Sequence, residues 1–387
     1  MSSLSSRMQS IQPFHVMSLL RRSKELEQKG CDIVHMEIGE PDFPTPPRVV
    51  DAGIRALAGG NIKYTIAAGL PELREAIAEY YRVRYRVEVS SKRIFVTPGG
   101  SGALLLAIAM QVNRRVQILM ADPCYPCNRN LVSLFDGDPR LIPVGPDRNY
   151  QLDLGCVETH WASNSRGVLI ASPSNPAGTL IDPEEFKAII DFVEKKDGFV
   201  ISDEIYHGLH YDAPAVTALQ FSDSVVVVNS FSKYFGMTGW RLGWLIVPDR
   251  SIEAVEKLVQ NIFISAPAHS QLAALAAFDE DTIRELERRR EAFRERRDFV
   301  IGQLTKIGFD IPVTPEGAFY IYAGCQSFSA NSFEFADFLL ERHGVAITPG
   351  RDFGIDRPEC QVRFAYTTSM DRLAEGMNRI RDAVRQG

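Results

Sequence analysis

The chain has 387 residues, of which 45% are hydrophobic and 24% charged, and its formal net charge is −6. That length exceeds what one hydrophobic core usually serves, so two structural units are expected. The 43 basic and 49 acidic residues are spread along the chain, which argues against a nucleic-acid-binding protein.

Cysteine content and apolar runs bear on metal binding and location. Six cysteines in a chain of this length do not make a disulfide scaffold, and the pair Cys124 and Cys127 lacks the second pair that a structural zinc site needs. We therefore expect no metal.

No signal peptide is visible at the start, and the longest apolar stretch, 102–110, is too short to cross a bilayer. The expected location is the cytoplasm, with no membrane partner.

Five short apolar runs are each followed at once by polar, glycine or proline residues. These runs end near residues 96, 120, 171, 201 and 228. Short, non-alternating runs rich in β-branched residues fit strands that are buried on both faces. Helical patterns lie between several of them, including 103–112 and 183–196, the second with Asp182 as its N-cap. We predict an α/β fold with a mostly parallel sheet flanked by helices, and a ligand site at the carboxyl ends of the strands.

The later part of the chain has a different pattern. A long charged helix is predicted over 281–304, followed by strand-like pieces at 319–322 and 361–365 and by a last helix from Asp371. We interpret this part, together with the N-terminal segment, as a smaller α+β domain. The predicted division is a large domain at 46–284 and a small domain made of 1–45 and 285–387.

The run Ser230-Phe231-Ser232-Lys233 follows the last of the five apolar runs. Its lysine is either an exposed loop residue or an amine whose pKa is lowered enough to attack a carbonyl group. Partial burial and a nearby cation lower the pKa of a lysine. Arg241, eight residues further on, would supply that cation and would also bind a phosphate.

A glycine-rich turn at 98–103 opens the helix after the first run. Backbone N–H groups at the start of a helix make an anion site, and glycine lets a phosphate approach the main chain. Two rival motifs fail here. The dinucleotide fingerprint would need glycine at Leu105, and the hydrolase nucleophile elbow would need glycine at Ala103.

Three further polar residues have two interpretations each. Asp203 ends an apolar run and is either a helix N-cap or the counter-ion of a buried cation. Asn175 lies in a proline-flanked turn, which is either a plain turn or a rigid mount for an amide. Arg363 lies in a strand and is either an edge-strand residue or a fork for a carboxylate.

Together these pieces resemble the fold-type I PLP-dependent aminotransferases of class I/II, in the bacterial aspartate-aminotransferase-like subgroup. The likeness covers about 39–368, and its landmarks follow the family's order. They include GEPDF at 39–43, SPSNPAG at 172–178, SFSK at 230–233 and PEGAFY at 315–320, with Ala177 in place of the usual threonine. The resemblance implies a seven-stranded-type sheet and pyridoxal 5′-phosphate (PLP) as the cofactor.

The resemblance also implies roles at the matching positions. Lys233 would form a Schiff base with PLP and carry a proton, and Asp203 would pair with the pyridine nitrogen. Tyr206 and Asn175 would bond the ring hydroxyl oxygen, and Tyr125 would stack on the ring. Arg363, Asn175 and the Gly39 backbone would bind the substrate carboxylate. The remaining cofactor-binding residues would be Gly99, Gly100, Ser101, Ser230, Ser232, Arg241 and, from a partner subunit of a homodimer, Tyr64.

The implied reaction is transamination between an L-amino acid and a 2-oxo acid, with 2-oxoglutarate as the default acceptor. Two alternatives stay open: a β-lyase acting on a sulfur amino acid, and an inactive aminotransferase-like binding protein. Phe14 to Met17 stand where aspartate-using relatives carry smaller residues, which puts aspartate in doubt and leaves alanine, other apolar and aromatic donors open.

Overall fold

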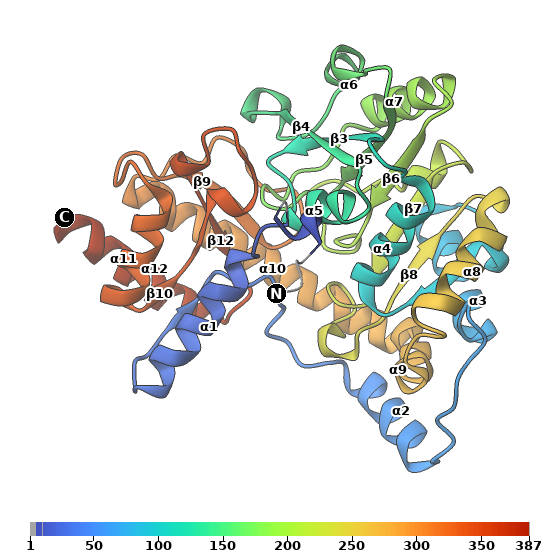
Figure 1. Ribbon diagram of the computed structural model, residues 1–387. Coiled ribbons are helices and arrows are strands. Elements are labelled where there is room, and N and C mark those ends of the chain that lie inside the picture. Colours follow the sequence, from blue (N-terminus) through green and yellow to red (C-terminus); the bar gives the residue numbers. More distant parts are fainter. Residues whose placement is uncertain (1–4, 10, 387) are drawn as a thin grey trace.

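The computed structural model describes residues 5–9 and 11–386, and Figure 1 shows two lobes of unequal size. The larger lobe contains a seven-stranded sheet in the order β2-β8-β7-β6-β5-β3-β4. All neighbouring pairs are parallel except those that β8 makes with β2 and β7. The predicted fold class is therefore confirmed. The strands are β2 Ile94–Thr97, β3 Gln117–Asp122, β4 Asp138–Pro143, β5 Ser165–Ala171, β6 Phe199–Asp203, β7 Val226–Ser230 and β8 Gly243–Ile246.

The central strands are buried on both faces, as their continuous apolar runs predict. Val200 and Val227 belong to one hydrophobic core, while Ile201, Val226 and Val228 point into the other. Side chains that alternate along a strand thus feed two cores, one on each side of the sheet. The helices of this lobe are α2 Pro47–Ala58, α3 Pro71–Tyr85, α4 Gly99–Gln111, α5 Pro126–Leu134, α6 Leu154–His160, α7 Pro183–Lys195, α8 Ile252–Ile262 and α9 Ala268–Ala274.

Local signals set several helix ends. Asp182 caps α7 as predicted, since its Oδ1 accepts hydrogen bonds from the amides of Glu184 at 2.8 Å and Glu185 at 3.1 Å. Pro183 occupies the first helical position, where its missing N–H removes nothing from the helix. The helix α4 begins at Gly99, four residues before the predicted start, so its first turn contains the glycine-rich stretch.

The smaller lobe combines both ends of the chain (Figure 1). Its antiparallel sheet has the order β11-β12-β9, so Arg363 lies on the central strand and the edge-strand interpretation is wrong. The short strand β1 pairs in parallel with β10. The elements are α1 His15–Gln28, β1 Val34–His35, β9 Tyr320–Gly324, α11 Ser332–His343, β10 Val345–Ala346, β11 Thr348–Pro349, β12 Gln361–Ala365 and α12 Met370–Gln386.

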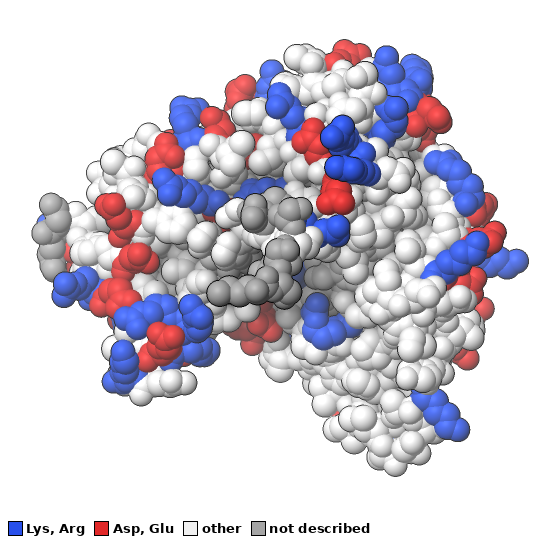
Figure 2. Space-filling model, viewed as in Figure 1, with Lys and Arg blue, Asp and Glu red and all other residues white. Residues whose placement is uncertain are grey.

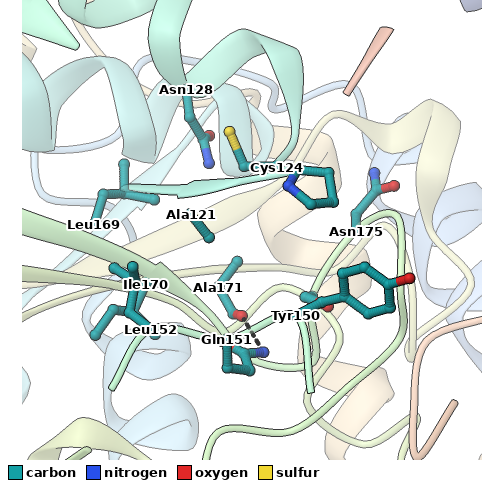
Figure 3. Close-up of a pocket in the computed structure, with 12 residues that line it drawn as sticks. Ala121, Cys124, Asn128, Tyr150, Gln151, Leu152, Leu169, Ile170, Ala171 and Asn175 are labelled. Carbon is teal, nitrogen blue, oxygen red and sulfur yellow. Dashed lines mark hydrogen bonds between the residues drawn. The ribbon is translucent and has the colours of Figure 1, made fainter. Parts of the chain in front are cut away.

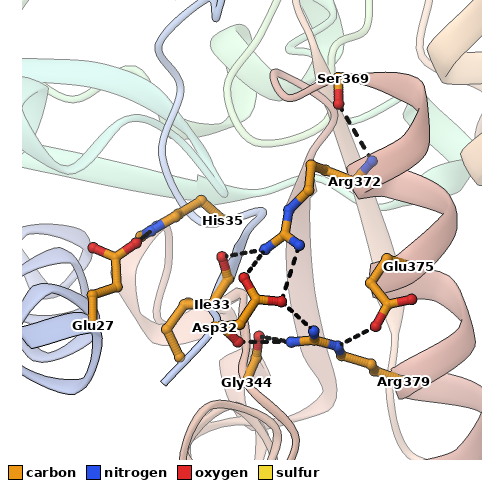
Figure 4. Close-up of polar contacts among 9 residues, drawn as sticks. All are labelled: Glu27, Asp32, Ile33, His35, Gly344, Ser369, Arg372, Glu375 and Arg379. Atoms are coloured by element: carbon orange, nitrogen blue, oxygen red, sulfur yellow. Dashed lines mark hydrogen bonds and ion pairs between the residues drawn. The ribbon is translucent and has the colours of Figure 1, made fainter. Parts of the chain in front are cut away.

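Ion pairs tie the segment after α1 to α12. Asp32 lies between Arg372 and Arg379, at 2.7 Å from the first guanidinium, and Glu375 accepts from Arg379 at 2.7 Å (Figure 4). The carboxylate shares two cations, which holds its pKa at about 2. These contacts keep β1 beside β10, and the chain then enters the site at 38–40.

The long helix α10, Glu280–Ile307, lies behind the centre of the view between the two lobes (Figure 1). Leu286, Phe293 and Val300 recur every seven residues on its buried face. Arg284 pairs with Glu280 on the exposed face, in agreement with the predicted solvated, salt-bridged surface. The predicted domain limit at 284 falls inside the first turns of this helix, and the division remains a prediction. No helix among the described residues is long and apolar enough to cross a membrane.

Candidate active site

A cavity of about 900 Å³ lies at the carboxyl ends of the central strands, beside the start of α4 and the small-lobe sheet. It is the place that the strand pattern predicts for a ligand. Twelve of the fourteen predicted site residues line it: Gly39, Gly100, Ser101, Tyr125, Asn175, Asp203, Tyr206, Ser230, Ser232, Lys233, Arg241 and Arg363. Positions as far apart in sequence as 39 and 363 therefore meet in one cavity.

Lys233 follows β7 directly, and its amine points into the cavity rather than into solvent. Its Nζ donates a hydrogen bond to the carbonyl oxygen of Gly39 at 2.6 Å. Burial, helped by the cationic side chains of Arg363 and Arg241, lowers the pKa of Lys233 to about 8, against the opposing effects of Glu40 and Asp203. A substantial fraction of the amine is thus neutral near physiological pH, as nucleophilic attack on a carbonyl group requires.

Asp203 is the last residue of β6 and lies in the same cavity. Burial raises its pKa to about 6, against the opposing effects of the Ile205 amide, at 3.2 Å, and of Lys233. A short turn rather than a helix follows β6, so the N-cap interpretation is wrong. A buried carboxylate of this kind is stabilised by a cationic ligand group.

The start of α4 forms a cradle for an anion. Gly99 has a φ of +73°, and a Cβ on it would lie 2.6 Å from Nη2 of Arg241. A Cβ on Gly100 would lie 3.2 Å from the Cβ of Ser230. Glycine is therefore needed at position 99, and a side chain at position 100 would be a tight fit. The two glycines leave the first amides of the helix open beside a guanidinium. Ser230 and Ser232 share a hydrogen bond of 3.0 Å at the rim of this cradle.

Aromatic and amide side chains line the walls. The hydroxyl of Tyr206 shares a hydrogen bond of 2.9 Å with the hydroxyl of Tyr320. The Tyr125 ring meets the ring of Phe14 edge to face, with 5.8 Å between their centroids. Tyr125 thereby connects the wall of the large lobe to the start of α1.

The turn that carries Asn175 is fixed from behind. Gln151 donates hydrogen bonds to the carbonyl oxygens of Thr179 at 2.8 Å and Ala171 at 3.2 Å. Figure 3 shows Gln151 and Ala171 on one side of a small cavity of about 20 Å³ and Asn128 on the other, with Asn175 at its edge. The turn is thus a rigid mount that aims the Asn175 amide at the large cavity.

Arg363 is only 2% exposed, although it carries a charge. It donates to Oδ1 of Asn175 at 2.9 Å, to the carbonyl oxygen of Glu37 and to the hydroxyl of Thr348 at 3.3 Å. Its guanidinium lies 4.1 Å from the centroid of the Tyr320 ring. With the guanidinium held on several sides, the fork presents a fixed edge to a carboxylate in the cavity.

Two predicted site residues stand apart from the lining. Gly99 lies just behind it, in contact with Arg241. Tyr64 is 79% exposed and is not brought to the cavity of its own chain.

Sequence reasoning assigned no role to Tyr320. This residue lines the cavity, and a Cβ on Gly39 would collide with its hydroxyl group. In the sequence it is one of several aromatic residues in an apolar strand, and only its place in the PEGAFY landmark could have singled it out.

The pair Cys124 and Cys127 gives no sign of redox or metal chemistry. Burial raises the pKa of Cys124 to about 12, so this thiol stays protonated and unreactive. Among the described residues, no group of three or more histidine, cysteine, aspartate and glutamate side chains could hold a metal ion.

One cavity thus brings together a buried lysine, a buried carboxylate, an anion cradle and a buried arginine. This combination is the one that the resemblance to aminotransferases predicts. Residues 32–380 match the family model described as aminotransferase class I and II. The chain belongs to this family, and it is a transaminase; members of the family are generally PLP-dependent.

Known relatives cover almost the whole chain. A Mycobacterium tuberculosis protein named valine–pyruvate aminotransferase is 38% identical over 96% of each chain. A Methanocaldococcus jannaschii protein named (5-formylfuran-3-yl)methyl phosphate transaminase is 36% identical over 98% of this chain and 99% of its own.

Solved structures agree with the fold. A crystal structure of an aminotransferase from Mycobacterium tuberculosis superposes with a TM-score of 0.96 at 36% identity, covering 100% of both chains. Thermus thermophilus aspartate aminotransferase with maleate gives 0.93 at 31% identity, covering 99% of this chain and 100% of the other.

Proposed function

We propose that the protein binds PLP through Lys233 as a Schiff base and moves an amino group between an L-amino acid and a 2-oxo acid. The observation that carries this proposal is the shared cavity. The low-pKa amine of Lys233, the buried carboxylate of Asp203 and the fork of Arg363 all face it. Each of these side chains costs free energy where it lies, and PLP with an amino acid would compensate all three.

The residues present fit the cofactor. Asp203 would pair with the pyridine nitrogen, whose protonated form offers the cation that this carboxylate lacks. Tyr206 and Asn175 would donate to the ring hydroxyl oxygen, and Tyr125 would cover one face of the ring. The phosphate would lie in the cradle, against Gly99, Gly100, Ser101, Ser230, Ser232 and Arg241. Bound in this way, PLP supplies an electron sink for the charge that develops at the substrate Cα.

The protein would orient the substrate and move its proton. Arg363 and the amide of Asn175 would bind the α-carboxylate together with the backbone N–H of Gly39, whose carbonyl oxygen accepts from Lys233. With the substrate held in this way, the amine of Lys233, once released from its link to the cofactor, would be the group that carries the proton from Cα of the substrate to C4′ of the cofactor. 2-Oxoglutarate, favoured by the resemblance alone, is the first acceptor to test, with pyruvate beside it.

A homodimer completes the proposal. Tyr64 and its neighbour Ile66 are exposed, as are Ile54 and Leu57 on α2. Figure 2 shows few charged side chains over the lower right of the molecule, where α2 and α9 lie. Exposed apolar side chains grouped in this way are typical of a protein interface. We propose that the patch packs on a second copy and that Tyr64 reaches the phosphate in the partner's site.

A half-reaction assay tests the proposal. Purified holoenzyme is mixed with single amino acids, and loss of the absorbance of the lysine-bound cofactor is followed. Transamination predicts one 2-oxo acid per site and a stoichiometric pyridoxamine form. A β-lyase would instead release ammonia and pyruvate over many turnovers without converting the cofactor. If no amino acid converts it, the protein binds without catalysis and the proposal is wrong.

A further inference from the structure

Most of the cavity lining left over by the proposed roles is apolar, and its polar exceptions are Glu40, Asn130, Thr238 and the hydroxyl of Tyr320. Phe14, which directly precedes α1, and Val16 and Met17 in its first turn contribute to this apolar wall. Leu104 and Leu131 add to it from α4 and α5. A substrate side chain that extends past the α-carboxylate clamp therefore meets hydrocarbon and aromatic surface, and an apolar group gains free energy by leaving water there.

The start of α1 is held in place by a carboxylate from a distant part of the chain. Asp352 accepts hydrogen bonds from the amides of His15 at 3.1 Å and Val16 at 2.8 Å. It thereby caps the helix at its positive end. Because the cap fixes the first turn, Phe14 and Met17 present a defined wall rather than a mobile one.

The charged side chains in the cavity lining also favour a substrate with an uncharged side chain. Among the lining residues, the acidic and basic side chains are Glu40, Asp203, Lys233, Arg241 and Arg363. The three cations already have partners in the proposed function, which are the cofactor aldehyde, its phosphate and the α-carboxylate. The side chain left over, Glu40, is negative. A second carboxylate on the substrate would find no further cation among the described residues of this chain that line the cavity, and it would be repelled by Glu40.

We infer that the amino donors of this enzyme carry neutral, apolar side chains of about leucine to phenylalanine size, and that aspartate and glutamate are poor donors. The inference rests on the proposed function and narrows it to a substrate class. The acceptor enters the same cavity, so an acceptor with one carboxylate, such as pyruvate, is favoured over 2-oxoglutarate.

The first test compares half-reactions and needs no acceptor. Leucine and phenylalanine are expected to convert the cofactor with a kcat/KM at least about 100-fold above that of aspartate and glutamate. A value for aspartate or glutamate equal to or above that for leucine would overturn the inference and leave transamination intact. Failure of every amino acid would instead contradict the proposed function.

The second test measures binding without chemistry. Calorimetric titration of the holoenzyme compares 3-phenylpropanoate with succinate, which share one carboxylate but differ at the far end. The inference predicts that 3-phenylpropanoate binds at least about tenfold more tightly. Equal or tighter binding of succinate contradicts it.

A designed cation sharpens the test. Met17 is 53% exposed and lies outside the proposed catalytic and cofactor-binding residues, so a long polar side chain is tolerated there. Met17→Arg is expected to raise kcat/KM for aspartate or glutamate at least about tenfold, because it supplies the missing partner. Met17→Gln, similar in length but uncharged, should not. If both variants leave these values unchanged while leucine still reacts, the wall does not determine side-chain choice and the inference fails.

Discussion

The two sides of the cavity are built in different ways. The cofactor side, formed by Gly99, Gly100, Asp203, Ser230, Lys233 and Arg241, comes from strand ends and turns of one sheet. The substrate side, formed by Phe14, Met17, Gly39, Tyr320 and Arg363, comes from the small lobe and the segments that join it. Neighbouring parallel strands align the cofactor side, whereas tertiary contacts between the two ends of the chain assemble the substrate side.

This difference in construction suggests that the cofactor side carries out the chemistry common to all substrates, whereas the substrate side selects among amino acids. Polar groups at the ends of fully buried strands have little freedom to move, which suits a cofactor that must be held in one orientation. The substrate side depends on helix ends and side-chain packing, which a few substitutions can alter. We therefore expect variants of the cofactor side to affect every amino acid alike, and variants of the substrate side to change which amino acid reacts.

The largest expected effect is on the cofactor side. Lys233→Ala should lower the rate of the half-reaction by about 10⁴-fold or more for all amino acids, because both the covalent link and the proton carrier are removed. Stopped-flow absorbance measures this rate. Lys233→Arg is the matched control, since it keeps a cation but cannot form the link, and it should be equally slow. A loss of less than tenfold in either variant would remove Lys233 from the mechanism.

On the substrate side, Arg363→Leu should lower kcat/KM by about 10³-fold, in line with the 2–5 kcal/mol typical of a buried charge pair. The absorbance of the bound cofactor should stay unchanged, because Arg363 does not hold it. Steady-state kinetics and a spectrum of the same preparation check both statements. Arg363→Lys keeps the charge but not the two-pronged guanidinium, so its kcat/KM should lie between those of the wild-type protein and of Arg363→Leu. If Arg363→Leu lost the absorbance of the bound cofactor, Arg363 would also hold the cofactor, and the two sides of the cavity would not have separate roles.

Asp203→Asn should separate function from stability. We expect kcat to fall by about 10²-fold and the apoprotein to become more stable, because burial raises the pKa of Asp203 from 3.8 to about 6. The charged carboxylate costs stability above pH 6. The cost falls as the pH drops from 6 to 3.8, because the folded state binds the proton first, and it is gone below 3.8, where the unfolded state binds it too. Urea unfolding at pH 8 should show a gain of about 3 kcal/mol, and at pH 4 a gain well under about 1 kcal/mol. A less stable variant at pH 8 would contradict the argument.

Cofactor uptake should depend on the protonation of Lys233. With a pKa of about 8, the neutral amine becomes about tenfold rarer for each pH unit below that value. The rate constant of PLP binding to the apoprotein should therefore rise with pH through 8 and level off above it. Absorbance after mixing, from pH 6 to 10, measures the profile. A midpoint above pH 10 would mean that the amine is not buried as described.

The smallest effect is expected at the proposed subunit contact. Tyr64→Phe removes one hydrogen bond to the phosphate, worth about 1 kcal/mol, so PLP affinity should fall about fivefold while the dimer persists. Equilibrium dialysis and sedimentation measure affinity and assembly. Ile54→Asp, which places a charge in the proposed interface, should dissociate the dimer. A monomeric wild-type protein would remove Tyr64 from the site.

The same contrast explains what could be predicted from the sequence. Short apolar runs that end in Asp203 or Ser230 indicate both the parallel sheet and the edge where a ligand binds, because local sequence defines a strand and its end. The pairing of Arg363 with Asn175, 188 residues apart, has no local signal. It became predictable only through resemblance to a family. The apolar wall depends on Asp352 capping α1, a contact that no sequence period reveals.

One measurement tests the central claim most directly. Holoenzyme is treated with sodium borohydride, which reduces a lysine–PLP link to a stable secondary amine, and the digested protein is analysed by mass spectrometry. The account predicts one reduced cofactor per chain, attached to the peptide that contains Lys233. Attachment to another lysine, or no attachment under conditions where PLP is bound, would contradict it.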